Sequence, residues 1–135
     1  MIIDIVKLVR DAMEKIGCGS AVDAEMDAHS PICISLKSLP EMFVEVQDES
    51  VLLWSKLDCA GEAHLARVAA DLVGYFVPRQ SAAFVCRRSL LSLTEDCMAL
   101  HAVVKADYLS NTEKFVEALE IFFADLCATH EILAQ

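Results

Sequence analysis

Residues 30–57 contain three short stretches of apolar side chains, and this segment constrains the fold more than any other. Ile32, Ile34 and Leu36 alternate with smaller or polar residues, which is the period of a strand with one buried face. The alternation returns over 42–47, after a proline-containing turn that interrupts any ladder. We therefore expect the segment to form a meander of three strands.

The third stretch of the meander, residues 51–54, reads Val-Leu-Leu-Trp and is apolar on both faces. A strand of this kind is either central in its sheet or presents its second face to something outside the monomer. The sequence leaves both interpretations open.

Three other stretches carry apolar side chains at helical spacing, over residues 2–16, 62–77 and 110–132. Gly17 stands where a left-handed cap would end the first helix, and Pro78 ends the second. Ser110 and Glu113 have the spacing of a capping box that opens the third helix.

Two further strands are expected between the second and third helices, a weak one within 81–91, at 83–86, and a clear one over 98–105, with a turn over 92–96. The element order is then α-β-β-β-α-β-β-α. This order predicts an α+β fold, an antiparallel sheet covered by helices. The length favours one domain over residues 1–135.

The chain is both apolar and strongly charged, with 56% hydrophobic residues, a mean hydropathy of +0.44 and a net charge of −10. This combination predicts more apolar surface than one small core needs, hence a homo-oligomer, a groove for an apolar partner, or both. The second helix carries small residues four apart beside its apolar stripe. They could lie against the sheet, but we favour a homodimer interface formed by Ala66, Ala70, Val73, Gly74 and Val77.

Charge and hydropathy also exclude some partners. A net charge of −10 argues against nucleic acid, which proteins bind through basic surfaces. The apolar runs are shorter than the roughly 20 residues that cross a bilayer, so no membrane insertion is expected. Asp4 follows the start too closely for a secretory signal, and a cytosolic location is predicted.

No metal or cofactor site is predicted. The six cysteines include no CxxC pair, and in a cytosolic chain they are expected to be reduced. Cys127 and His130 stand one helical turn apart, but two ligands without a second pair do not make a zinc site.

The best local cluster for catalysis is Asp27, His29 and Ser30. Adjacent residues on an extended chain point to opposite sides, so His29 and Ser30 would not converge, and no third group is evident. We therefore interpret this segment as a polar loop at the strand entry, and the protein as a binding module rather than an enzyme.

Four motifs together resemble a known family. They are LVRxAMExIGC at 8–18, DxHSxIxIxL at 27–36 followed by Leu39-Pro40, VxLW at 51–54, and DYLSxxEKFxxALxxF at 107–122. In register, they are similar to the invasion protein B/SpaK group of type III secretion chaperones, class I, of the subclass that serves several effectors. Between residues 58 and 96 only a helix is aligned, by pattern.

The resemblance implies a small acidic α+β homodimer in the bacterial cytoplasm that is not an enzyme and uses no ATP. Proteins of this class bind the N-terminal region of effectors, just behind the secretion signal, and hold it extended. The bound effector stays competent for export and is delivered to the secretion apparatus, including its ATPase.

An extended segment would bury alternate side chains in apolar pockets. We assign these effector-binding pockets to Leu8, Val9, Met13, Ile32, Ile34, Phe43, Val44, Leu52 and Trp54, of which no more than half are expected to touch a partner. The rest, and Trp54 in particular, could be plain core. Two alternatives stay open: a dimeric adaptor or co-regulator that binds a folded partner, and a small enzyme using Asp27 and His29.

Overall fold

The computed structural model describes residues 4–23, 25–27, 29–94 and 97–135. Its helices and strands confirm the predicted order and the α+β class. They are α1 (Ile5–Ile16), β1 (Ile32–Ile34), β2 (Met42–Gln47), β3 (Ser50–Leu57), α2 (Glu62–Phe76), β4 (Leu90–Leu93), β5 (Met98–Val104) and α3 (Thr112–Leu133). No helix among these residues is both long and apolar enough to span a bilayer.

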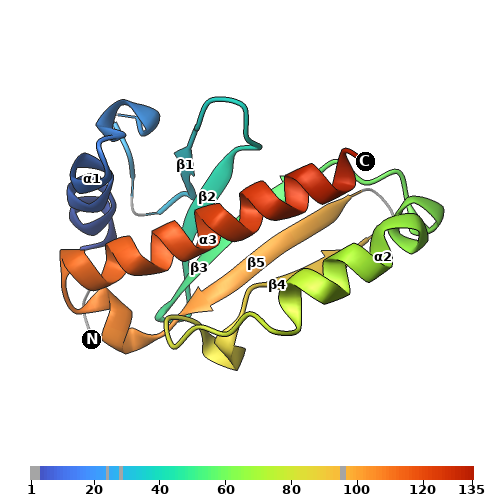
Figure 1. The fold of residues 1–135 in the computed structure, drawn as a ribbon. Coiled ribbons are helices and arrows are strands. Elements are labelled where there is room, and N and C mark those ends of the chain that lie inside the picture. The colour runs from blue at the N-terminus through green and yellow to red at the C-terminus, as the bar shows by residue number, and fades with distance from the viewer. Residues whose placement is uncertain (1–3, 24, 28, 95–96) are drawn as a thin grey trace.

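The strands form one antiparallel sheet in the order β1-β2-β3-β5-β4. The central strand is β3, the one that is apolar on both faces. Helix α3 runs across the sheet, with α1 and α2 on either side of it (Figure 1). The predicted meander is thus confirmed.

The helices cover one face of the sheet. Every β5 side chain on that face is buried, and those between them are not, because successive strand residues point to opposite sides. The same alternation runs through β3. The helices add their own apolar stripes, such as Phe115, Leu119 and Phe122 of α3, and one continuous hydrophobic core results.

The ends of α1 follow from local chemistry. The Asp4 carboxylate accepts a hydrogen bond from the backbone N–H of Lys7 at 3.1 Å, as an N-cap does. Gly17 ends the helix in the left-handed conformation at φ 89°, where a side chain would be strained. The cap predicted at Gly17 is confirmed.

The cap of α3 lies one residue beyond the predicted one. Asn111 accepts from the backbone N–H of Lys114 at 2.9 Å, whereas the Ser110 hydroxyl donates to the carbonyl of Asp107 at 2.8 Å. The reason is the backbone. Ser110 has helical angles at the end of a preceding 3₁₀ turn, and Asn111 is extended, as an N-cap must be.

The fourth strand lies at Leu90–Leu93, not at 83–86, and the predicted turn over 92–96 was wrong for its first two residues. Phe84 is buried and forms a single bridge to Val104. Beyond it, Cys86 and Arg87 are left-handed, with φ near 66° and 65°, which ends any ladder. The apolar run at 83–86 therefore anchors the core instead of forming a strand.

The turn between β2 and β3 is strained. It consists of Asp48 and Glu49, with φ of 46° and 67°, the arrangement in two-residue hairpins that favours Asn-Gly. Glu49→Gly should raise the free energy of unfolding by about 1 kcal/mol, because glycine adopts this φ without a steric penalty. Denaturant unfolding measures the change. Asp58→Gly, at an exposed loop position without positive φ, is the control and should bring no gain.

Candidate partner-binding surfaces

The helices leave the second face of the sheet open, and no described strand side chain on this face is fully buried. Directly paired residues form a row across all five strands, one from each: Cys33, Phe43, Trp54, His101 and Leu90. The rings of Phe43 and Trp54 are stacked, with centroids 4.3 Å apart. We call these five residues, with Leu52 and Val103 on the same face, the uncovered row.

The uncovered row has the chemistry of a surface for an extended apolar segment. Leu52 and Val103 are paired across β3 and β5, beside the two aromatic rings. Polar groups lie at its margins, such as the Ser92 hydroxyl, 2.7 Å from a His101 ring nitrogen. Apolar side chains flanked by polar groups are typical of surfaces that bind another chain.

The nine residues predicted to bind effectors do not form one surface. The structure buries six of them in the core beneath the helices, with at most 9% of each exposed: Leu8, Val9, Met13, Ile32, Ile34 and Val44. The other three, Phe43, Leu52 and Trp54, lie half-buried in the uncovered row. Their role in binding stays a prediction, and sequence reasoning missed His101 and Val103 beside them.

An apolar groove of about 380 Å³ lies between α2 and the segment that leads into β4. Val73 and Val77 on the α2 side are 58% and 59% exposed, and Leu90 on the other side is 40% exposed. These are three of the most exposed large apolar side chains among the described residues. The groove is therefore a second surface suited to contact with another chain.

All five residues predicted for the dimer interface are exposed along α2: Ala66, Ala70, Val73, Gly74 and Val77. Val73 and Val77 line the groove, and the small residues form a ridge beside them. A Cβ added at Gly74 would meet no atom within 4 Å, so the ridge is open at this position. The homodimer itself stays a prediction.

A buried carboxylate lies next to the groove, and sequence reasoning missed it. Asp125 of α3 is 2% exposed and accepts hydrogen bonds from the Tyr75 hydroxyl at 2.8 Å, the Ser89 hydroxyl at 2.7 Å and the Arg79 guanidinium. Burial, and then the bond to Asp125, raise the pKa of Tyr75. The sequence signal for this buried carboxylate was the position of Asp125 in the apolar stripe of α3, three residues after Phe122.

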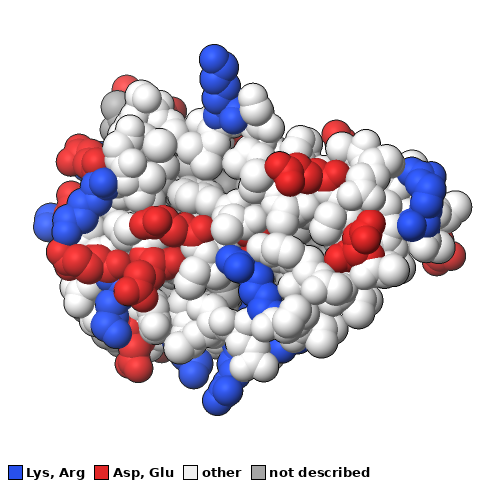
Figure 2. Space-filling model, viewed as in Figure 1, with Lys and Arg blue, Asp and Glu red and all other residues white. Residues whose placement is uncertain are grey.

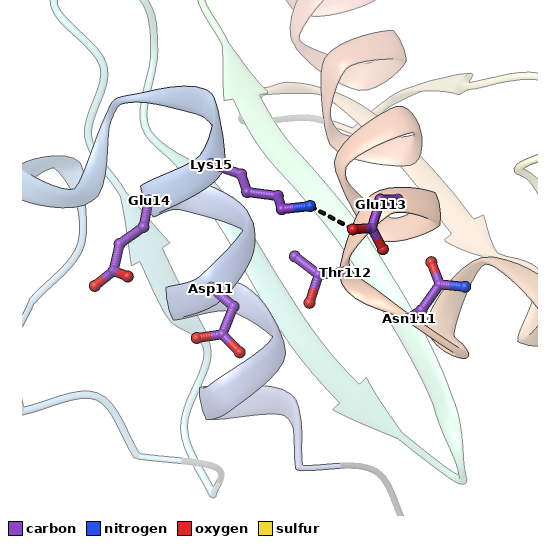
Figure 3. Close-up of a pocket in the computed structure, with 6 residues that line it drawn as sticks. All are labelled: Asp11, Glu14, Lys15, Asn111, Thr112 and Glu113. Carbon is purple, nitrogen blue, oxygen red and sulfur yellow. Dashed lines mark hydrogen bonds and ion pairs between the residues drawn. The ribbon is translucent and has the colours of Figure 1, made fainter.

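On the face shown in Figure 2, smaller groups of acidic side chains lie along the molecule, and the largest group lies on the side formed by α1 and the start of α3. There a hollow of about 590 Å³ is lined by Asp11, Glu14, Lys15 and Glu113, among others. Lys15 and Glu113 point toward each other across the gap and form an ion pair, while Glu14 points away (Figure 3). The side chains that line the hollow are polar or charged, and they come from α1 and the start of α3.

The Lys15–Glu113 ion pair predicts a pH dependence of stability. The hydrogen bond from Lys15 lowers the pKa of Glu113 from its ordinary value of 4.5. Its stabilising effect is therefore present above pH 4.5 and is lost as the pH falls through the lowered pKa. Lys15→Gln should unfold at slightly lower denaturant than the unmodified chain near neutral pH. The difference should shrink with salt and disappear as the pH falls through the lowered pKa of Glu113, and a difference that persists unchanged in strong acid would contradict the assignment.

The polar loop before β1 contains Asp27 and His29, the residues of the small-enzyme alternative. The Asp27 carboxylate accepts from the backbone N–H of His29 at 2.9 Å, a local turn that occupies it with the backbone. Within the described residues, no group of three or more His, Cys, Asp or Glu side chains could hold a metal ion.

A small polar cluster lies at the edge of the sheet. The Cys33 thiol and the Ser35 hydroxyl donate to the same oxygen of Glu41, at 2.9 and 3.1 Å. These bonds lower the pKa of Glu41. Burial and the bond to Glu41 raise the pKa of Cys33, so this thiol is a hydrogen-bond donor and a poor nucleophile.

The fold and these surfaces define a small α+β protein with one helix-covered and one uncovered sheet face. The model of the Invasion protein B family matches residues 17–95, more than half of the chain. The surface presentation of antigens protein SpaK of Salmonella typhimurium (strain LT2) is 32% identical over 123 residues, which are 90% of this chain and 89% of that protein. SpaK of Salmonella typhi gives the same values. The chain therefore belongs to the Invasion protein B family, as its motifs predicted.

Proposed function

We propose that this protein is a type III secretion chaperone of the bacterial cytoplasm. It binds the N-terminal region of effector proteins in extended form, keeps them soluble and competent for export, and directs them to the secretion apparatus and its ATPase. Membership of the Invasion protein B family supports this function. The role is binding, without catalysis or a cofactor.

The uncovered row is the observation that carries the proposal. It offers apolar side chains on β2, β3, β5 and β4, with the Phe43–Trp54 stack on the neighbouring strands β2 and β3. An extended segment places every second side chain on one side, so it can bury them along such a surface while its other side chains stay in water. Ordering a flexible segment is costly, and a long apolar contact offsets that cost.

The homodimer is proposed at the groove between α2 and β4. Val73, Val77 and Leu90 would be buried there against a second copy of the chain. The ridge of small residues would let the two α2 helices approach closely. This arrangement leaves the uncovered row of each subunit accessible, apart from Leu90, which belongs to both surfaces.

Co-expression with candidate effectors tests the proposed function. The chaperone should copurify with an effector, and limited proteolysis of the complex should leave a short N-terminal effector fragment bound. Release of a folded effector domain by the protease is expected. Retention of a folded domain instead, with loss of the N-terminal segment, would replace the chaperone by an adaptor.

A further inference from the structure

The Asp125 carboxylate accepts hydrogen bonds from both of the segments that flank the groove between α2 and β4. One oxygen, Oδ1, accepts from Tyr75 and Arg79, which stand four apart at the end of α2 and just beyond it. The other oxygen, Oδ2, accepts from Ser89, which lines the groove on the β4 side. A single side chain of α3 thus holds two segments that are otherwise separated by the groove.

Helix α2 is less deeply buried than α1. Of the 15 residues of α2, only Val68 and Leu72 are fully buried. In α1, by contrast, nearly the whole apolar stripe is fully buried. Its C-terminal end leads into a connection that contains the left-handed Cys86 and Arg87. The bonds from Tyr75 and Arg79 to Asp125 therefore add a directional contact to the packing of Phe76 at this end.

A buried carboxylate with three donors is a strong and directional contact. Charge-assisted hydrogen bonds are shorter and stronger than neutral ones, and each oxygen fixes the direction of its donors. An apolar contact in this place could slide, whereas the carboxylate has one arrangement that satisfies all three donors. Among the described residues, no buried side-chain nitrogen or oxygen lacks a partner.

We propose that Asp125 is a positioning residue for self-association: it sets the spacing between α2 and β4, and through it the fit of the groove to a second copy of this chain. The proposal rests on the proposed homodimer at this groove. Asp125 lies outside the proposed interface. Its removal is nevertheless expected to weaken the dimer by more than the loss of folding stability alone would.

Two measurements on Asp125→Ala test this role, dimer dissociation by sedimentation and unfolding by denaturant. We expect the dissociation constant to rise by at least about 30-fold, because both groove walls lose their common acceptor. The control is Met13→Ala, which opens a fully buried site on α1 away from the groove. It should lower stability by a comparable amount and change dimerisation by no more than about threefold.

Conservative variants keep the test valid if Asp125→Ala does not fold. Ser89→Ala removes the donor on the β4 side alone and should weaken the dimer by about tenfold. Asp125→Asn retains an acceptor for Tyr75 and can donate to Ser89, so it should restore most of the affinity. Equal weakening by Met13→Ala and Asp125→Ala at equal loss of stability would overturn the proposal.

Amide hydrogen exchange separates this proposal from the dimer on which it rests. Asp125→Ala should speed exchange at the end of α2, where the N–H of Val77 bonds the carbonyl of Val73, but not in α1. An unmodified chain that stays monomeric at all concentrations would overturn the dimer. Unchanged exchange at Val77 in Asp125→Ala would overturn the positioning role whether or not the chain dimerises.

Discussion

Ala70→Glu on α2 is expected to convert the homodimer into monomers. Ala70 is exposed in the middle of the ridge of small residues, beside Val73. In the dimer the new carboxylate would be buried without a partner, which costs about 3 kcal/mol or more, or a rise of at least 100-fold in the dissociation constant. Sedimentation equilibrium over a range of concentrations measures it.

Ala124→Glu is the matched control for the dimer. It makes the same change at an exposed position of a helix, on the side of α3 opposite its buried stripe. Ala124→Glu should leave the dimer intact, and both variants should stay folded, since neither substitution disturbs the core. A dimer that is unaffected by Ala70→Glu would show that the ridge faces water and that the subunits meet elsewhere.

Phe43→Asp should abolish effector binding and leave the chain folded and dimeric. Phe43 stacks on Trp54 in the middle of the uncovered row, where a charge would be buried by a bound segment. A loss of at least about 100-fold in affinity is expected. Titration calorimetry with the N-terminal region of an effector measures this loss, and sedimentation checks the dimer.

Gln47→Asp separates the effect of position from the effect of charge. Gln47 lies on the same face of the same strand as Phe43, but at its exposed end. The variant should bind the effector nearly as well as the unmodified chain. Insoluble or unfolded Phe43→Asp would mean that Phe43 is part of the core, and Phe43→Ala would then decide whether the ring contributes to binding.

The alternation of apolar residues predicted the sheet because it reports strand geometry directly. It held for β5, where every second side chain is buried, and for the central β3. The placement of β4 failed because burial and strand formation are different properties. Phe84 is fully buried from a connecting segment, whereas Leu90–Leu93 forms the strand with no side chain fully buried.

The residues of the uncovered row were harder to predict than the strands, because alternation separates two faces without saying which one the helices cover. The predicted set took Ile34 and Val44 from one face and Phe43 and Trp54 from the other, so it could not form a single surface. Which face is covered depends on how α1 and α3 pack, a long-range property. Asp125 was missed for a related reason: its three partners come from α2 and from the segments after it.

The fluorescence of Trp54 tests the central proposal most directly, because it is the sole tryptophan and lies half-buried in the uncovered row. Binding of a tryptophan-free N-terminal segment of an effector should shift the Trp54 emission to shorter wavelength and protect Trp54 from quenching by acrylamide. The midpoint of this fluorescence titration should agree with the dissociation constant that calorimetry gives. Binding seen by calorimetry with unchanged Trp54 emission and quenching would place the effector elsewhere and contradict the proposal.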